Sequence, residues 1–208
     1  MSRFYPVLDW DCFGEKAATV AHLLVSEGCS MIQVRAKNLP ANRFFHFVEQ
    51  VLRSAGTKCR IIVNDRLDIA LAAGAAGAHL GAEDLPLSAA RAIAGDSFIL
   101  GATCRDPESA VRAERDGADY IGAGAVFPTR SKSDTRLIGL QGLAAITGAV
   151  RIPVYAIAGI TLDNAAPVIG AGAYGCAGIS VLTGAGDPAA AFRGLERALE
   201  DAAANINS

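Results

Sequence analysis

The five cysteines of this 208-residue sequence are scattered, and no C-x-x-C pair occurs among them. This excludes a zinc ribbon or a thioredoxin-like site, so we expect free thiols in a reducing compartment. There is also no apolar run of about 18 residues, the length needed to span a bilayer. The first residues, MSRFYPVLDWD, lack the apolar core of a signal peptide. We therefore expect a cytoplasmic protein with no membrane partner.

An excess of basic residues is absent as well. Lys and Arg number 19 against 21 Asp and Glu, which gives a formal net charge of -2, and neither sign forms a long run. Proteins that bind nucleic acid usually present a basic face, so no nucleic-acid partner is expected. Hydrophobic residues make up 51% of the chain, enough for a full core. Anionic small molecules remain candidate ligands if local cations or a metal hold them.

Short apolar runs alternate with longer amphipathic ones along the whole chain. The candidate strands are residues 4–9, 31–36, 60–64, 77–81, 98–103, 119–124, 153–158 and 175–180. Two of the helices between them are predicted to begin at Asp-Pro pairs, at 106–107 and 187–188. This alternation predicts an α/β protein with a parallel sheet, and eight repeats favour a single (β/α)8 TIM barrel over residues 1–208. The alternative, an open doubly wound sheet, usually has a G-x-G-x-x-G turn after its first strand, and LDWDCFGE contains none.

In such a barrel the functional groups gather at the C-terminal ends of the strands. Along the second strand and directly after it, Gln33, Arg35 and Lys37 are spaced by two, so an extended chain places them on one face. Inward positions usually carry branched apolar residues, so Gln33 and Arg35 indicate a ligand site. Lys37 equally fits the start of a solvated loop.

The third strand ends on Asn64 and Asp65, and Asp84 follows the fourth. One of the first two can cap the next helix. Neighbouring parallel strands lie about 4.8 Å apart, so Asp65 and Asp84 can meet across the mouth. Two carboxylates suit Mg²⁺, which also takes oxygens from substrate phosphates. His79, inside the fourth strand, is expected to be a hydrogen-bonded core residue.

Later strand ends predict a second anion site. Thr103 ends the fifth strand; Cys104 has no nearby base in sequence and is not expected to be a nucleophile. A long loop after the sixth strand carries hydroxyls and cations that suit phosphate. Small residues after strands seven and eight allow main-chain N–H groups to approach a ligand. These candidates are Thr129, Arg130, Ser131, Lys132, Gly159, Ile179 and Ser180.

The segments IQVRAK, IIVNDRLDIALAAGAAGAHLGAEDLP, GATCRDPESA, GADYIGAGAVFPTRSK, IPVYAIAGIT and GAYGCAGISVLTGAGDP resemble the thiamine phosphate synthase family over almost the whole chain. The resemblance implies a TIM barrel that joins hydroxymethylpyrimidine diphosphate to a phosphoethylthiazole, or to its carboxylated form. It also implies a dissociative substitution that releases pyrophosphate with Mg²⁺ as cofactor. The thiazole nitrogen is already nucleophilic, so the chemistry requires no protein base.

The resemblance assigns a role to each candidate. It implies that Asp65 and Asp84 hold Mg²⁺. It implies that the pyrimidine diphosphate is bound by Gln33, Arg35, Lys37, Asn64, Thr103 and Lys132, and the thiazole phosphate by Thr129, Arg130, Ser131, Gly159, Ile179 and Ser180. Lys132, Arg35 and Thr103 are expected to take part in catalysis.

The chain departs from the family pattern at several positions. The family commonly has Ser at Thr103, Gln at Ala82, Thr at Ser131 and Gly-Gly at 158–159, where this chain has Ala-Gly. A related branch isomerises the thiazole with a histidine in the loop after the fifth strand, at the position of Cys104.

Three alternatives are left open. They are this tautomerase, a non-catalytic protein that binds thiamine precursors, and a sugar-phosphate isomerase with Glu83 as base. The preferred thiazole isomer is left open as well. So are the choice between a monomer and a homodimer, and whether this chain is the main synthase or a second copy.

Overall fold

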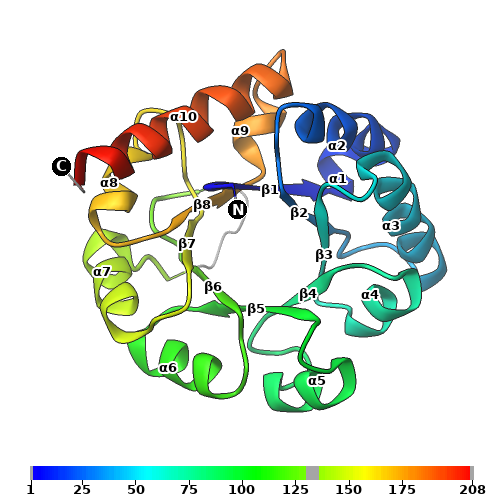
Figure 1. Cartoon of the computed structure of the whole chain (residues 1–208), viewed down its shortest axis with the longest axis horizontal. Coiled ribbons are helices and arrows are strands. Elements are labelled where there is room, and N and C mark those ends of the chain that lie inside the picture. Colours follow the sequence, from blue (N-terminus) through cyan, green and yellow to red (C-terminus); the bar gives the residue numbers. More distant parts are fainter. Residues whose placement is uncertain (1, 130–135, 207–208) are drawn as a thin grey trace.

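The computed structural model describes residues 2–129 and 136–206, and over these residues eight parallel strands close into a barrel in sequence order. The strands are β1 Phe4–Asp9, β2 Met31–Arg35, β3 Arg60–Asn64, β4 Gly77–Leu80, β5 Ile99–Cys104, β6 Tyr120–Ala123, β7 Val154–Ile157 and β8 Gly175–Gly178. Helices surround them as an outer ring (Figure 1). The predicted (β/α)8 barrel is therefore confirmed, and the open-sheet alternative is wrong because β8 pairs with β1.

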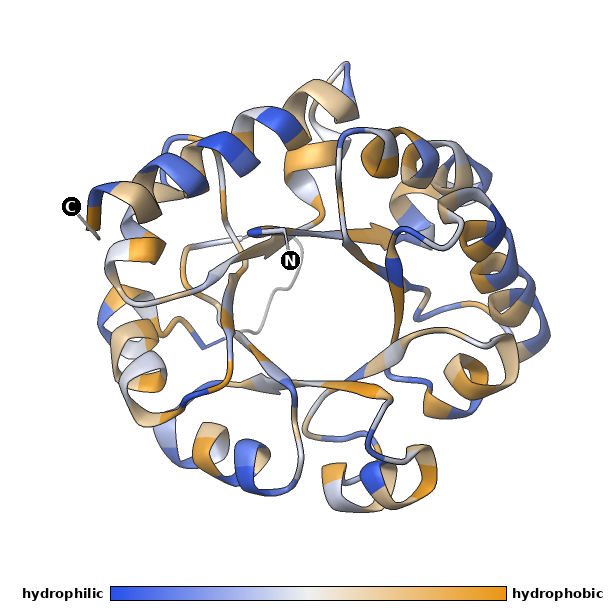
Figure 2. Cartoon of the chain, in the orientation of Figure 1, coloured by the Kyte–Doolittle hydropathy of each residue, from blue (hydrophilic) through white to orange (hydrophobic). Residues whose placement is uncertain are grey.

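The helices follow the strands in alternation. They are α1 Trp10–Phe13, α2 Ala17–Ser26, α3 Ala41–Ala55, α4 Leu67–Ala73, α5 Leu87–Ala94, α6 Pro107–Arg115, α7 Gly139–Ala149, α8 Ala166–Gly170, α9 Ser180–Thr183 and α10 Pro188–Ile206, with a short 3-10 turn at Gly14–Lys16. The outer sides of α3 and α10 are largely hydrophilic (Figure 2). No helix among the described residues is long and apolar enough to cross a membrane.

The two Asp-Pro pairs begin helices as predicted. The Asp106 carboxylate accepts a hydrogen bond from the Ser109 N–H at the start of α6, at 2.7 Å. The Asp187 carboxylate accepts from the Ala189 N–H at the start of α10, at 2.9 Å. The prediction that Asn64 or Asp65 caps the next helix is wrong, because the residue before α4 is Arg66 and no side chain caps that helix. Both side chains are consequently left to face the mouth.

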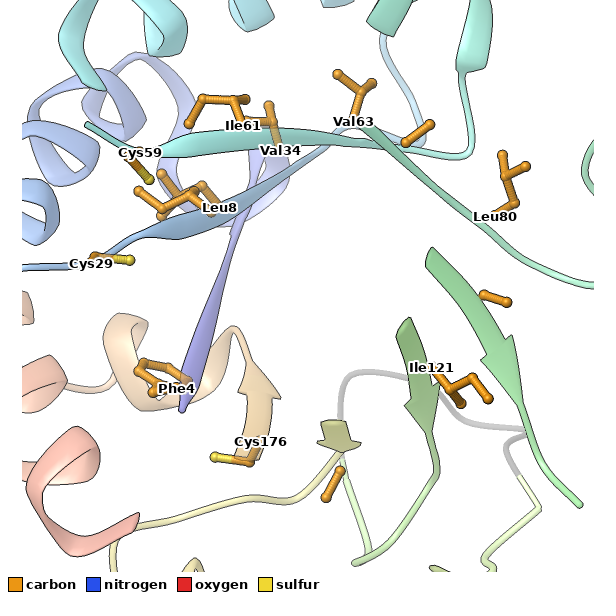
Figure 3. Packing of buried hydrophobic residues seen from close by; sticks show 14 of the residues in the cluster. Phe4, Leu8, Cys29, Val34, Cys59, Ile61, Val63, Leu80, Ile121 and Cys176 are labelled. Carbon is orange, nitrogen blue, oxygen red and sulfur yellow. The ribbon is translucent and has the colours of Figure 1, made fainter. Parts of the chain in front are cut away.

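The core has two layers because successive strand residues point to opposite sides of the barrel wall. Most buried apolar residues lie between the strands and the helices, as Figure 3 shows for Leu8, Val34, Ile61 and Val63. A smaller cluster fills the barrel itself, and its members are Tyr5, Met31, Ile62, Tyr120, Tyr155 and Ala177. Three tyrosines inside a barrel are unusual for positions that branched aliphatic residues dominate.

All five cysteines are free thiols, as predicted, and four of them are buried.

Candidate active site at the barrel mouth

The C-terminal ends of β2 to β5 surround a polar pocket of about 470 Å³. We call it the polar pocket; its lining includes Arg35, Lys37, Asn64, Asp65, Glu83, Asp84, Thr103, Arg105 and Arg112. Most of the sequence-predicted residues for a diphosphate and a cation thus come together at one place. Four of the lining residues are cations, which suits an anionic ligand.

Arg35 is held in this pocket by a carboxylate on the neighbouring strand. Its guanidinium donates to Asp9, and the side chains are 20% and 3% exposed, respectively. The pairing follows from register, since Asp9 and Arg35 are partner residues of β1 and β2. Asp9 also accepts from the N–H of Asp11 and so begins α1. A buried pair of this kind keeps the guanidinium in one position.

The two predicted metal-binding carboxylates meet across the mouth. Asp65 lies within hydrogen-bonding reach of Asp84, and the Asp84 carboxylate accepts from the Gly81 N–H at 2.7 Å. Burial raises the pKa of Asp84, and the negative charge of Asp65 raises it further. The Nζ atom of Lys37 lies 3.4 Å from Asp65 and offsets part of that charge. Lys37 thus begins a loop and also faces the site.

This donor set fits Mg²⁺. Among the described residues, no group of three or more His, Cys, Asp or Glu side chains converges on one point. The protein therefore offers two hard oxygen ligands and leaves the rest of a coordination shell to water and substrate, which is how Mg²⁺ is usually bound with phosphates. The repulsion between Asp65 and Asp84 is what a cation between them would relieve.

Asp65 has a backbone φ of 64°, in the left-handed region that few non-glycine residues adopt. Its N–H donates to the carbonyl of His79 on β4 at 2.8 Å, which ties the turn to the next strand. This conformation turns the Asp65 side chain toward Lys37 and Asp84 rather than toward the N–H groups of α4. Such outliers are often found at functional sites.

A second pocket, of about 100 Å³, opens over β6, β7 and β8. We call it the small-residue pocket; its lining includes Thr103, Arg105, Gly124, Ala125, Thr129, Ala158, Gly159, Ile179 and Ser180. Four of the residues predicted for the second anion site are therefore in one place. The predicted eighth strand ends at Gly178, two residues early, and Ser180 begins α9 instead. Arg130, Ser131 and Lys132 lie outside the described residues, so their predicted roles stay predictions.

The loop after β7 is shaped by two consecutive residues with positive φ, Ala158 at 79° and Gly159 at 68°. A Cβ at Gly159 would lie 2.5 Å from the carbonyl oxygen of Pro128, so only glycine fits there. Ala158 has a Cβ in a conformation that favours glycine. Where the family commonly has the first glycine of a Gly-Gly pair, this chain therefore has a strained alanine, Ala158, on the pocket wall.

A third, central pocket of about 90 Å³ continues below both others into the barrel, and its lining includes Gln33, Arg35, Asn64, His79 and Thr103. Thr103 lines all three pockets. His79 is buried, as predicted, and both its ring nitrogens have partners: the Tyr120 hydroxyl at 3.0 Å and the Thr103 hydroxyl at 2.9 Å. Thr103 therefore stands where the pockets meet and rests on a buried histidine.

Cys104 is buried on β5, and this burial raises the pKa of its thiol to about 11. The thiol is protonated near neutral pH, as expected for a residue that is not a nucleophile. A protonated thiol is also no substitute for the histidine that a tautomerase would use at this position.

Sequence reasoning missed several residues of the site. Asp9 and Arg105 each stand at or directly after a strand end, so the rule used for the other strands would have found them. Arg112 lies on α6 and reaches the polar pocket from the helix. Tyr5 and Tyr120 lie within strands, where an aromatic residue is typical of ordinary core, and nothing in the sequence connects them.

The chain matches the family model described as thiamine monophosphate synthase over residues 4–182. The thiamine-phosphate synthase of Moorella thermoacetica is 49% identical over 172 residues, which cover 81% of each protein. Among solved structures, a thiamine phosphate pyrophosphorylase from Pyrococcus furiosus aligns with a TM-score of 0.86 and 38% identity over 96% of both chains. A 3-hexulose-6-phosphate synthase, 19% identical with a TM-score of 0.71, covers 96% of this chain and is fully covered itself; it shows the fold alone.

Proposed function

The chain belongs to the thiamine monophosphate synthase family, and from this premise we propose how the barrel mouth divides its two substrates. The function is thiamine-phosphate synthesis, a transferase reaction. We propose that the polar pocket binds hydroxymethylpyrimidine diphosphate and that the small-residue pocket binds the phosphoethylthiazole or its carboxylated form. The single observation that carries this division is that two pockets of different character meet at Thr103.

The pyrimidine ring is placed in the central pocket, between the two others. Gln33 is 5% exposed there and Asn64 is 8% exposed, so both present amide groups inside the barrel. The diphosphate then extends outward into the polar pocket, toward Arg35 and Lys37. Since the bond to be broken lies between ring and diphosphate, the reacting carbon comes to lie at the boundary, beside Thr103.

Positive charge develops on the pyrimidine methylene as the diphosphate departs, and negative charge develops on the leaving group. Arg35 and Lys37 stabilise that negative charge, and the Thr103 hydroxyl donates a hydrogen bond to it. Bound by Asp65, Asp84 and diphosphate oxygens, Mg²⁺ would supply additional positive charge to the leaving group. The buried Asp9 holds Arg35 in place before substrate arrives, so little reorganisation is needed in the transition state.

The thiazole nitrogen attacks from the small-residue pocket. Much of the wall there consists of glycine, alanine and serine, including Gly159 and Ser180, which allow a phosphate to approach main-chain N–H groups closely. No protein base is needed, because the thiazole nitrogen has a lone pair and carries no proton to remove. Glu83 is exposed at the rim of the polar pocket, so the isomerase alternative has no buried base there.

Pyrophosphate release tests the proposal directly. The assay would contain both substrates and Mg²⁺, and would be repeated with EDTA and with each substrate omitted in turn. Release only in the complete mixture is the expected result. Release from the pyrimidine diphosphate alone would mean hydrolysis, and no release from a folded protein would favour the tautomerase or the non-catalytic binding protein. Location in the cytoplasm stays a prediction of the same proposal, and the choice between a monomer and a homodimer stays open.

Ala158→Gly is expected to improve binding of the thiazole phosphate. Glycine removes a Cβ from a residue with a φ of 79° on the pocket wall, and the strain of such a residue is about 1 kcal/mol. Relief of that strain lets the loop adjust to a phosphate, so we expect KM for the thiazole phosphate to fall by about 2- to 5-fold. KM for the pyrimidine diphosphate, measured in the same preparations, should not change. Equal changes in both values would contradict the division into two pockets.

A further inference from the structure

A continuous line of hydrogen bonds crosses the barrel below the mouth, from Gln33 to Thr103. Gln33 donates from Nε2 to the Tyr5 hydroxyl at 3.1 Å, and this hydroxyl lies 2.9 Å from that of Tyr120. The Tyr120 hydroxyl lies 3.0 Å from Nδ1 of His79, and Nε2 of His79 lies 2.9 Å from the hydroxyl of Thr103. We call these five residues the barrel relay. Both of its ends line the central pocket.

The sense of the barrel relay is determined by its first member. The Gln33 amide N–H can only donate, so the Tyr5 oxygen accepts, and the Tyr5 proton must find its own acceptor because the ring is buried. Tyr120 is the acceptor within reach, and its proton then goes to Nδ1 of His79. The opposite sense would leave the Tyr5 proton with no acceptor among the contacts that the structure describes for it, which is costly in a core.

His79 is thereby placed in one tautomer. Nδ1 accepts from Tyr120, so the ring proton is on Nε2 and is donated to the Thr103 oxygen. The Thr103 proton is then directed away from His79, toward the mouth where the three pockets meet. At the other end, Nε2 of Gln33 donates to Tyr5, so the Gln33 carbonyl oxygen is left to accept from a ligand in the central pocket.

The barrel wall is built to accommodate these rings. Asn64, His79, Gly101 and Tyr120 form one register row across β3 to β6, so Gly101 lies directly between the histidine and the tyrosine. A Cβ at Gly101 would lie 2.4 Å from the Tyr120 hydroxyl and 2.5 Å from Nδ1 of His79. A Cβ at Gly122 would lie 3.2 Å from Cε1 of His79. Glycines at these two positions of neighbouring strands therefore leave the space in which the rings of His79 and Tyr120 meet.

The tyrosines keep their protons over the whole range in which the enzyme would work. Burial raises the pKa of Tyr5 above its ordinary value, and burial raises that of Tyr120 well above it. The barrel relay is consequently a fixed set of donors and acceptors, and no proton needs to pass along it.

We propose that the barrel relay makes His79, Tyr120 and Tyr5 positioning residues, which hold the Thr103 hydroxyl as a hydrogen-bond donor to the departing diphosphate and hold the Gln33 carbonyl oxygen as an acceptor for the pyrimidine. The inference rests on the proposed function, since it needs a diphosphate beside Thr103. It assigns the buried tyrosines a part in turnover, where the strand pattern alone would assign them to packing. Its effect is on kcat through Thr103.

A double-mutant cycle on kcat for pyrophosphate release separates this role from packing. Thr103→Val should lower kcat by about 10- to 100-fold, the size of a lost hydrogen bond to a charged group. Tyr120→Phe should lower kcat about 3- to 10-fold in the wild-type background but not in the Thr103→Val background. In a Thr103→Ser background, which keeps the hydroxyl, the effect of Tyr120→Phe should return. Equal loss in all three backgrounds would overturn the inference.

Ile62→Val is the matched control. Ile62 belongs to the same buried cluster as the relay tyrosines, but it is not among the residues that line the central pocket, and its side chain forms no hydrogen bond. Removing one methyl group there leaves a hole similar in size to a lost hydroxyl and should leave kcat unchanged. A loss equal to that of Tyr120→Phe would mean that any hole in the cluster slows turnover, and would contradict the proposal.

The tautomer of His79 provides a test that needs no substrate. Nitrogen NMR of the full chain should show the proton on Nε2 and none on Nδ1, and Tyr120→Phe should disturb that state. A proton on Nδ1 in the wild type would reverse the barrel relay and overturn the inference, even if pyrophosphate release is normal. Conversely, the chain could show the expected tautomer and release no pyrophosphate. The proposed function would then be wrong, and the hydrogen-bond assignment would still hold.

Discussion

Asp65→Asn is expected to lower Mg²⁺-dependent pyrophosphate release by about 10²- to 10³-fold, because a metal is worth several kcal/mol of charge stabilisation on the leaving group. Asparagine keeps the shape of the side chain and tolerates the left-handed φ of 64° at this position better than alanine does. The fold should therefore survive, and the loss should come from the missing carboxylate. Asp84→Asn should lose as much, since the two carboxylates face one another.

The readout is the Mg²⁺ dependence of kcat in each variant, with far-UV circular dichroism to confirm that the barrel is intact. Asp68→Asn is the matched control, because Asp68 lies three residues from Asp65 but pairs with Arg66 at the surface. That variant should keep wild-type activity. Full activity in both Asp65→Asn and Asp84→Asn would exclude them as the magnesium ligands.

Arg35→Met is expected to lower the free energy of unfolding by about 2–3 kcal/mol, because it leaves the carboxylate of Asp9 buried without its partner. Asp9 is only 3% exposed, whereas Arg35 is 20% exposed, so the expected loss in unfolding free energy is smaller than for a fully buried pair. The same change removes a cation from the polar pocket. We therefore also expect a large rise in KM for the pyrimidine diphosphate, together with a fall in kcat.

Urea unfolding measures the first effect as a lower midpoint with an unchanged slope. Arg35→Met combined with Asp9→Asn should recover part of the stability, since no buried charge is then left unpaired, but none of the activity. Arg197→Met is the control: Arg197 pairs with Asp201 on α10, where the side chains are 84% and 71% exposed, and such pairs contribute at most about 1 kcal/mol. If the two arginine variants were equally stable, the Asp9 pair would have no structural importance.

The order of strands and helices was readable from the sequence because it depends on local periodicity. Alternation of apolar runs placed all eight strands within two residues, and Asp-Pro pairs placed the starts of α6 and α10. The rule that functional groups follow strand ends then brought Arg35, Asp65, Asp84 and Gly159 to the mouth. These predictions need only the spacing of residues along one strand and the knowledge that parallel strands end on the same side.

What the sequence alone determined was therefore which residues reach the mouth, and the tertiary structure decided what those residues contact there. Whether Asp65 caps α4 or faces Asp84 depends on one backbone angle, and the strain at Ala158 depends on another. The Asp9–Arg35 pair and the barrel relay join residues 24 to 115 positions apart, across strands whose register is set by the closure of the whole barrel. Such contacts are not local in sequence, so only the closed fold could place a tyrosine of β1 against one of β6 and bring His79 to the Thr103 hydroxyl.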